Sequence, residues 1–271
     1  MATVALLQDM SRCIACKGCQ VACKEWNELP AEPTWNSGSY ENPRDLSTTT
    51  WTRIQFLEDE EKGEPRWRFF KEQCMHCTDA ACVEVCPTGA LKRSALGFVT
   101  LERDLCNGCG YCAKFCPYGV PRVEQESALS GRAKIAKCTF CEDRVTNSGM
   151  PACAKACPSG AIQFGDREAM LGRGRERVAQ LRRQGRAGAT LYGEKELGGL
   201  GIMYVLPDAP SRYPSLPADP EASFRTALSW QRSWQPAGAA VVLLGIVGLV
   251  VNFAAVSWRN RGRDEEGGTP S

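Results

Sequence analysis

The chain has 271 residues, of which 33 are basic and 31 acidic, so its formal net charge is +2. This balance gives no electrostatic indication of a nucleic-acid or acidic partner, and the 43% share of hydrophobic residues excludes a disordered chain. The length suits one or two compact domains. Cysteine is the exception to this ordinary composition, because sixteen cysteines accompany a single histidine, His76.

The N-terminal segment argues against an exported disulfide protein. The first nine residues contain no basic n-region, and their apolar stretch is too short for the h-region of a signal peptide, so we expect none. The cysteines are also bunched, and neighbours three residues apart are poorly placed to join distant segments. We therefore expect metal ligation rather than disulfides.

Four cysteine motifs repeat along the chain and use all sixteen cysteines. The first and third have the spacing C-x2-C-x2-C-x3-C, the second has C-x2-C-x4-C-x3-C, and the fourth lengthens the middle gap to eleven residues. A proline with its fixed φ follows the last cysteine of the second, third and fourth motifs. In chain order the motifs are Cys13, Cys16, Cys19 and Cys23; Cys74, Cys77, Cys82 and Cys86; Cys106, Cys109, Cys112 and Cys116; and Cys138, Cys141, Cys153 and Cys157.

The spacing within these motifs suits [4Fe–4S] clusters. Cysteines at three-residue steps can wrap three corners of a cubane, and in bacterial two-cluster ferredoxins the fourth cysteine ligates the other cluster. Zinc is the alternative, because the fourth motif alone has the two separated pairs of a zinc ribbon. Four such runs, three of them closed by Cys-Pro, favour iron–sulfur clusters, and complete quartets indicate four-iron cubanes.

Outside the motifs the sequence predicts two further elements of the body. Alternation over residues 51–56 predicts a strand with a half-buried edge. The basic stretch from Asp166 to Gln184 predicts a helix, although Gly172 and Gly174 weaken it near its middle. For its basic face, exposure to solvent is favoured over contact with a partner or membrane phosphates. The apolar residues on its other side are Met170, Leu171, Val178 and Leu181.

The C-terminal part predicts a linker and then a membrane span. Five prolines fall between positions 207 and 220 among few apolar residues, so we expect an extended linker over 191–233. An uncharged apolar segment predicts a transmembrane helix over 234–258, followed by a charged tail over 259–271. Tryptophans at 230, 234 and 258 fit the two membrane interfaces, and glycines at 238, 245 and 248 allow close packing against a partner's membrane helix.

The basic residues that flank this span predict its orientation. Three arginines follow the helix and two precede it, a mild bias that puts the C-terminus in the cytoplasm and the cluster-bearing body in the periplasm. The reverse orientation is the alternative. The expected location is the inner membrane, with a single pass. The arginines are Arg225 and Arg232 before the helix and Arg259, Arg261 and Arg263 after it.

Several stretches around the motifs match one known family. They are Cys13-Ile-Ala-Cys-Lys-Gly-Cys-Gln-Val-Ala-Cys-Lys-Glu-Trp-Asn27, Tyr40-Glu-Asn-Pro-Arg-Asp-Leu46, Cys74-Met-His-Cys77, Cys106-Asn-Gly-Cys-Gly-Tyr-Cys112, Lys137-Cys-Thr-Phe-Cys-Glu-Asp-Arg-Val145 and Met203-Tyr-Val-Leu206. With the late apolar helix, they resemble the iron–sulfur (beta) subunit of membrane-bound formate dehydrogenases. The cysteine motifs alone are shared with the electron-transfer subunits of nitrate, dimethyl sulfoxide and polysulfide reductases. Nitrate reductase relatives replace one cysteine of the third motif by tryptophan, whereas here that motif is complete.

The resemblance implies an α+β fold with two nested ferredoxin-like bicluster modules plus one C-terminal transmembrane helix. An outer module over 1–68 and 119–190 would carry motifs one and four, and an inner module over 69–118 would carry motifs two and three. The implied ligands are Cys13, Cys16, Cys19 and Cys157 for cluster 1; Cys74, Cys77, Cys82 and Cys116 for cluster 2; Cys106, Cys109, Cys112 and Cys86 for cluster 3; and Cys138, Cys141, Cys153 and Cys23 for cluster 4.

The chain carries no catalytic constellation: the sequence has no Ser/His/Asp set, no Walker loop and no dinucleotide fingerprint. We therefore expect a non-catalytic electron-transfer subunit. The resemblance implies electron relay from a molybdenum or tungsten pterin (alpha) subunit that oxidises formate to a cytochrome b-type (gamma) subunit and quinone. The alternatives are a beta subunit for another pterin oxidoreductase and a membrane-tethered zinc-ribbon interaction protein. His76 is expected either to hydrogen-bond a cluster sulfur or to be a packed loop residue.

Overall fold

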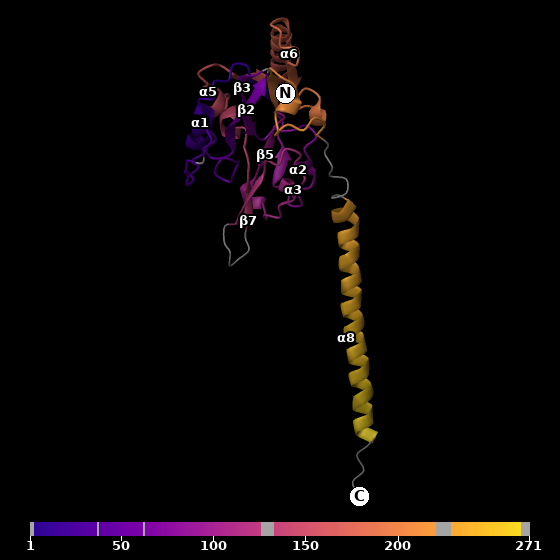
Figure 1. Ribbon diagram of the computed structural model, residues 1–271. Coiled ribbons are helices and arrows are strands. Elements are labelled where there is room, and N and C mark those ends of the chain that lie inside the picture. The colour runs from indigo at the N-terminus through magenta and orange to yellow at the C-terminus, as the bar shows by residue number, and fades with distance from the viewer. Residues whose placement is uncertain (1–2, 37, 62, 126–132, 221–228, 267–271) are drawn as a thin grey trace. The chain divides into compact units, whose positions relative to one another are not determined.

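The computed structural model describes residues 3–36, 38–61, 63–125, 133–220 and 229–266. The chain divides into two compact units, Met1–Ala222 and Ser223–Ser271. The first unit contains all sixteen cysteines and is built from short strands and helices (Figure 1).

A four-stranded sheet forms the centre of the first unit. Its order is β8 (Ile162–Asp166), β1 (Val4–Asp9), β10 (Ile202–Leu206) and β9 (Thr190–Tyr192), where β1 and β10 are parallel and the outer pairs antiparallel. All five residues of β10 are buried, as expected for a continuous apolar run in a strand covered on both faces. The prediction of a linker over 191–233 is therefore wrong at its start, because tertiary pairing makes this run a central strand.

Helix α6 (Arg167–Arg183) covers one face of this sheet. The Asp166 carboxylate caps it by accepting hydrogen bonds from two backbone N–H groups of its first turn. The four apolar residues predicted on one side of the helix are buried against β1 and β10, and the basic residues opposite are mostly exposed. Position 174 has no room for a side chain, because a Cβ on Gly174 would lie 2.7 Å from Cδ1 of Leu191. The helix is continuous, and its glycine permits close contact with β9.

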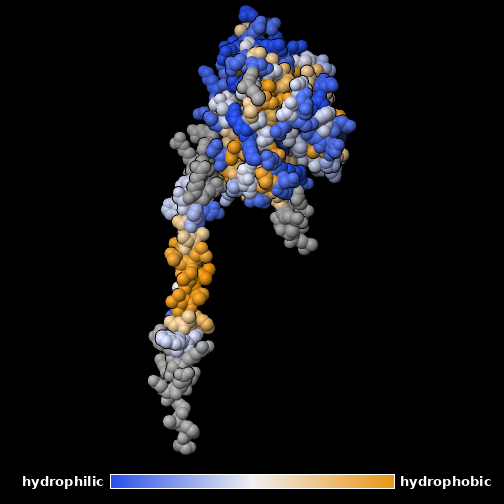
Figure 2. Space-filling view, turned by 180° about the vertical axis from the view of Figure 1, so that it is seen from behind, coloured by the Kyte–Doolittle hydropathy of each residue, from blue (hydrophilic) through white to orange (hydrophobic). Residues whose placement is uncertain are grey.

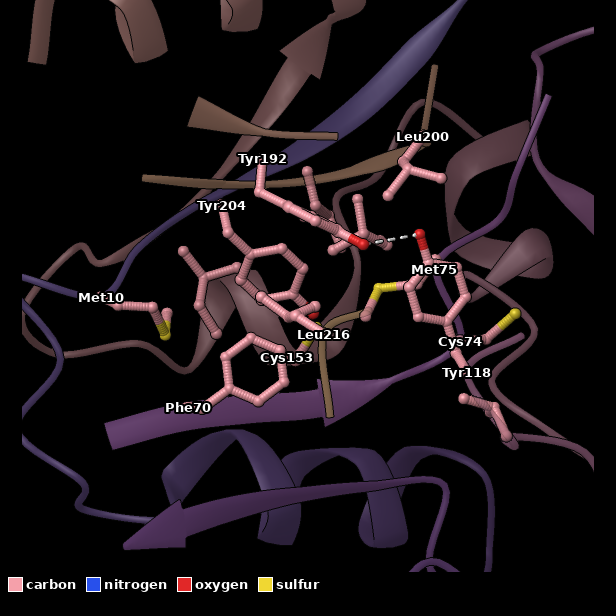
Figure 3. Close-up of a cluster of buried hydrophobic side chains, with 14 of the residues drawn as sticks. Met10, Phe70, Cys74, Met75, Tyr118, Cys153, Tyr192, Leu200, Tyr204 and Leu216 are labelled. Carbon is pink, nitrogen blue, oxygen red and sulfur yellow. Dashed lines mark hydrogen bonds between the residues drawn. The ribbon is translucent and has the colours of Figure 1, made fainter. Parts of the chain in front are cut away.

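The main hydrophobic core covers the other face of the sheet. In Figure 3 the Phe70 ring lies beside Tyr204, with ring centroids 4.8 Å apart, and the hydroxyls of Tyr118 and Tyr192 are 3.1 Å apart. Tyr213 and Leu216, which follow β10, are also buried in this core. The proline-rich segment after residue 207 thus wraps along the body, where only its apolar side chains enter the core.

Three antiparallel hairpins accompany the sheet. The longest pairs β2 (Thr52–Glu61) with β3 (Glu64–Gln73) and confirms the strand predicted over 51–56. The expected half-buried edge is wrong, because residues 52–55 are all buried. The other hairpins are β4 (Leu91–Arg93) with β5 (Val99–Leu101), and β6 (Arg122–Gln125) with β7 (Ala133–Ala136).

Short helices connect these strands. Helix α1 lies beside α5, and α2 beside α3 (Figure 1). Each of these four helices carries cysteines, so their pairing positions the cysteine motifs relative to one another. The helices are α1 (Gly18–Trp26), α2 (Ala81–Glu84), α3 (Tyr111–Lys114), α4 (Glu142–Thr146) and α5 (Ala152–Lys155), with 3-10 turns at Arg103–Leu105, Glu196–Gly198 and Pro210–Arg212.

Two polar anchors hold the irregular segments to the body. The Arg68 guanidinium, whose side chain is 4% exposed, donates to Asp208 at 2.8 Å and to Asp59 at 3.0 Å. The Glu32 carboxylate accepts hydrogen bonds from three hydroxyls of the 47–50 turn. Although its partial burial raises the pKa of Glu32, these hydrogen bonds and Lys24 bring the pKa below its ordinary value.

The second unit consists mainly of one long helix. A π-helical turn over Trp230–Trp234 leads into α8 (Gln235–Glu266). Its segment Gln235–Trp258 has a mean hydropathy of 2.6 and is long and apolar enough to cross a membrane; Figure 2 shows the apolar band along it. This matches the span predicted over 234–258. Arg225 and residues 267–271 of the predicted tail lie outside the described residues, as do the side chains of Arg232, Arg259, Arg261 and Arg263.

Candidate metal centres

The four cysteine motifs share one backbone path. The residue two positions after the first cysteine of each motif has a left-handed conformation: φ is 53° at Ala15, 48° at His76, 71° at Gly108 and 63° at Phe140. Three of these residues carry a side chain that disfavours this conformation, so the surrounding structure imposes the curl of the loop. The turn brings a backbone N–H to the ligand sulfur, as with Gly108 N and Phe140 N, each 3.4 Å from a cysteine Sγ.

Short helices and tight turns position the later cysteines of each motif. The third cysteine of every motif lies on a helix, namely α1, α2, α3 or α5. In the second, third and fourth motifs, a Cys-Pro turn follows whose glycine has φ between 61° and 65°. A glycine adopts this conformation without steric cost. The three glycines are Gly89, Gly119 and Gly160.

One cavity collects the four cysteines expected for cluster 1. Cys13, Cys16 and Cys19 line it together with Cys157 from the fourth motif, and Lys71 from β3 completes the lining. Burial raises the pKa of the Cys13 thiol, and the nearby Cys157 and Cys16 raise it further. The first and fourth motifs, separated by more than a hundred residues of sequence, therefore meet in space.

A second cavity collects the four cysteines expected for cluster 4. Cys138, Cys141 and Cys153 line it with Cys23 from the first motif. Cys23 and Cys157 thus cross between motifs, since each lies with three cysteines of the other motif.

The inner two motifs cross in the same way. Burial raises the pKa of the Cys77 thiol, and the nearby Cys74, Cys116 and Cys82 raise it further. Burial also raises the pKa of Cys112 to about 12, and the cysteines that add to this are Cys109, Cys106 and Cys86. Cys116 therefore lies with the second motif and Cys86 with the third. These neighbours are the sets expected for clusters 2 and 3.

Fourteen of the sixteen cysteines are buried or half-buried, and this has a chemical consequence. Burial raises the pKa of Cys19 and of Cys23 to about 12, so these groups would be neutral thiols at neutral pH. Metal binding requires the thiolate, and a metal cation supplies the charge that stabilises it. Cys16 and Cys109 differ from the rest because they are exposed.

The cysteine sets do not form a site for a single ion. Among the described residues, which include all sixteen cysteines, no three His, Cys, Asp or Glu side chains converge closely enough to hold one metal ion. A structural zinc ion would draw its thiolates to about 2.3 Å from one centre. The sets of clusters 1 and 4, each lining a cavity, fit a cubane whose four irons each take one sulfur.

Unpaired polar groups around the cluster 4 cavity also fit a sulfur-rich group. The Thr52 hydroxyl and the Gln73 amide nitrogen belong to residues that line this cavity, and both atoms are buried with no hydrogen-bond partner in the described part of the chain. Buried donors normally have an acceptor. The Asn27 amide, on the same cavity, lies 3.7 Å from the Cys23 sulfur.

Buried cations accompany the cysteines. Lys71 and Lys137 are each 1% exposed. Burial alone lowers the pKa of Lys71, but Cys153, Cys19, Cys138 and Cys23 in their thiolate forms raise it above its ordinary value. Lys137 donates to the backbone oxygens of Val99 at 2.7 Å and Cys138 at 3.0 Å. The cysteine pattern alone gave no signal for these two residues.

His76 is buried beside them and is neutral. Its Nδ1 accepts a hydrogen bond of 3.1 Å from the Val99 N–H, so the proton of the ring lies on Nε2. Burial, aided by Lys137, holds the pKa of His76 well below its usual range. Its Nε2 has no partner in the described residues, so the ring is not a fully satisfied packed histidine.

Two family models match the region that contains the motifs. Both are described as a 4Fe-4S dicluster domain; one matches residues 65–167 and the other residues 12–90. With the sixteen cysteines, these matches fit four [4Fe–4S] clusters rather than a zinc ribbon.

Curated relatives cover nearly the whole chain. The nitrate-inducible formate dehydrogenase iron-sulfur subunit of Escherichia coli K12 is 40% identical over 268 residues, 98% of this chain and 89% of that protein. The formate dehydrogenase iron-sulfur subunit of Haemophilus influenzae is 41% identical over 90% of this chain and 77% of its own length. A formate dehydrogenase 2 subunit beta (cytochrome c-553) of Nitratidesulfovibrio vulgaris is 37% identical over 54% of this chain and 69% of its own length.

These relatives are electron-transfer subunits rather than catalytic ones, which agrees with the absence of a catalytic constellation in the sequence. The identity extends from the cysteine loops through the central sheet to the C-terminal region. The chain therefore belongs to the family of formate dehydrogenase iron–sulfur subunits.

Proposed function

We propose that the four clusters are bound by cysteine sets that cross between motifs. Cluster 1 takes Cys13, Cys16, Cys19 and Cys157, and cluster 4 takes Cys138, Cys141, Cys153 and Cys23. Cluster 2 takes Cys74, Cys77, Cys82 and Cys116, and cluster 3 takes Cys106, Cys109, Cys112 and Cys86. The observation that carries this assignment is the pair of cavities lined by the outer sets. The outer module over 1–68 and 119–190 and the inner module over 69–118 follow from it.

The neighbours of the cysteines give the clusters an order. Cys153 of cluster 4 is close enough to Cys19 of cluster 1 to raise the pKa of Cys19. Cys138 of cluster 4 lies similarly near Cys74 of cluster 2, and Cys82 of cluster 2 near Cys112 of cluster 3. The order is therefore 1, 4, 2, 3. Electrons enter at one end of this row and leave at the other.

The exposed cysteines identify the two ends of the row. Cys16 belongs to cluster 1 and Cys109 to cluster 3, the two terminal clusters, whereas each set at the centre of the row lacks an exposed cysteine. A terminal cluster must approach the surface to exchange electrons with another subunit. Exposure at both ends supports a relay between two partners rather than a storage site with one entrance.

The partners follow from the family. The relatives are named as subunits of formate dehydrogenase, so one partner is a catalytic subunit that oxidises formate, with a molybdenum or tungsten pterin. The second partner is a membrane cytochrome b-type subunit that delivers electrons to quinone; the Nitratidesulfovibrio vulgaris relative names a cytochrome, cytochrome c-553. The span Gln235–Trp258 anchors the chain beside this subunit in the inner membrane. The arginine bias supports a periplasmic body.

Metal analysis with paired substitutions tests the ligand sets. In the anaerobically purified complex we expect 4 × 4, or about 16, irons and as many sulfides per chain, with reduced-cluster EPR signals. Cys16→Ala with Cys157→Ala should remove one shared cluster and leave about 12 irons, whereas Cys16→Ala with Cys141→Ala should remove two and leave about 8. If each motif instead bound its own cluster, both pairs would remove two clusters and leave about 8 irons. Four zinc ions and no EPR signal would refute electron transfer.

Two further measurements test the partners and the orientation. Addition of formate to the anaerobic complex should reduce the clusters, and their EPR signals should disappear again when a quinone analogue is added. A complex whose clusters are reduced by dithionite but not by formate would refute the proposed substrate. Protease added to spheroplasts should cleave the body if it is periplasmic, and protection there with cleavage in inverted vesicles would reverse the orientation.

A further inference from the structure

Two residues at the end of β3 lie between the cavities of clusters 1 and 4. Lys71 and Gln73 are two positions apart on a strand, so their side chains project on the same face. Each is 1% exposed. Lys71 lines the cluster 1 cavity and Gln73 lines the cluster 4 cavity. The Lys71 Nζ donates a hydrogen bond to Oε1 of Gln73, which connects the two cavities through these side chains.

The chemistry of this hydrogen bond fixes the orientation of the Gln73 amide. A lysine ammonium has three donors and no acceptor, so it selects the amide oxygen of its partner. The amide nitrogen of Gln73 must then point away from Lys71. This nitrogen is buried and has no partner in the described residues. Its N–H groups therefore need an acceptor that the protein does not provide in the cavity lined by Cys23, Cys138, Cys141 and Cys153.

A cluster sulfur is the acceptor that this cavity would supply. A buried donor left unpaired costs about 1–3 kcal/mol, and Thr52, directly opposite Gln73 in the hairpin, presents a second unpaired donor to the same cavity. Hydrogen bonds to sulfur and nearby charge are among the factors that set the potential of an iron–sulfur cluster. Both stabilise the reduced state, which carries one more negative charge.

Lys71 adds a charge that no carboxylate neutralises. Within the described residues it forms no ion pair, while it is close to Cys19 of cluster 1 and Cys153 of cluster 4. A buried charge is screened less than an exposed one. Its effect should therefore reach both outer clusters, whereas the Gln73 amide reaches only cluster 4.

We propose that Lys71 and Gln73 form a buried, positively charged relay that raises the reduction potentials of clusters 1 and 4. The charge of Lys71 acts on both clusters, and an amide N–H···S hydrogen bond from Gln73 acts on cluster 4 alone. Lys71 acts as a positioning residue for Gln73 as well as a charge. This inference rests on the ligand sets proposed above. It makes β3 part of the electron-transfer machinery, although it contributes no cluster ligand.

Redox titration followed by EPR tests the relay in the anaerobically purified complex. Gln73→Met should lower the potential of one cluster, and Lys71→Met should lower the potentials of two, including that same one. A tenfold weaker reduction corresponds to about 59 mV for one electron, and we expect at least this shift for cluster 4 in Lys71→Met. Lys71→Arg keeps the charge and should retain potentials close to those of the wild type.

Gln55→Met is the matched control. Gln55 is buried on β2 of the same hairpin, but its amide donates to Glu72 and Ser215, and it does not line either cavity. This variant should leave all four potentials unchanged. If Gln73→Met does not retain its iron, Gln73→Glu decides, because a carboxylate keeps Lys71 paired while it removes the donor. The potential of cluster 4 in Gln73→Glu should be lower than in the wild type, and an unchanged potential would overturn the hydrogen bond.

The outcomes separate this inference from the proposed function. Four cubanes with unshifted potentials in both Gln73 and Lys71 variants would overturn the relay and leave the electron-transfer function intact. The relay would also be overturned if the cluster whose potential falls in Gln73→Met is not one of those whose potential falls in Lys71→Met. A wild-type complex without four clusters would instead refute the ligand sets on which the inference rests.

Discussion

A single methyl group at Gly108 should displace one cluster-binding loop. Gly108 lies between Cys106 and Cys109, with φ at +71°, and a Cβ there would lie 2.3 Å from the backbone oxygen of Ala133 and 2.5 Å from its carbonyl carbon. Backbone atoms in a paired strand cannot rotate away as a side chain can. Gly108→Ala must therefore move either the cysteine loop or β7.

The two costs of this substitution can be separated. A left-handed conformation costs an alanine about 1–2 kcal/mol, and overpacking adds about 1–3 kcal/mol or more. Gly119 has nearly the same conformation, with φ at +61°, but nothing lies within 4 Å of a Cβ at that position. Gly119→Ala therefore carries the first cost alone, and the difference between the two variants measures the overlap with β7.

Iron content and urea resistance provide the assay. Gly119→Ala should keep about 16 irons per chain with a slightly lower urea midpoint for loss of cluster absorbance, while Gly108→Ala should lose cluster 3 and retain about 12. Equal iron content and equal midpoints in the two variants would refute the reasoning, because they would mean that the loop and β7 do not pack backbone to backbone.

Three other perturbations follow from the fold. Arg68→Leu leaves the Asp208 carboxylate without its cation, while Asp59 keeps Arg212, and should cost about 2 kcal/mol, seen as a lower urea midpoint; an unchanged midpoint would contradict the anchor. Because the pKa of Glu32 is lowered in the folded chain, its contribution is present above the unfolded pKa of about 4.3 and is lost as pH falls through the folded pKa. The urea-midpoint advantage of wild type over Glu32→Gln should thus shrink below about pH 4, and a pH-independent difference would refute this. A chain ending at Ala222 retains the whole first unit, so it should bind iron but no longer sediment with membranes; sedimentation of that chain would point to a second membrane contact.

The sequence alone was sufficient for the features that depend on local spacing. Three-residue steps between cysteines specify which chemistry a loop can perform, and this is why iron–sulfur clusters followed from Cys13 to Cys23 and its repeats before any fold was known. The apolar run over 235–258 likewise predicts a membrane span, because crossing a bilayer needs only length and apolarity. The buried side of α6 followed from its helical period.

Only the tertiary structure decided the features that depend on long-range pairing. Ile202–Leu206 looked like the start of a linker, yet parallel pairing with β1 makes it a central strand of the sheet. Strand pairing joins residues almost 200 positions apart, and no local pattern encodes that partner. No sequence pattern pointed to Lys71 and Gln73 either, because a lysine and a glutamine on a strand are common. Their role depends on the two cavities that they line. What makes them functional is burial beside the cysteines, which only the folded chain creates.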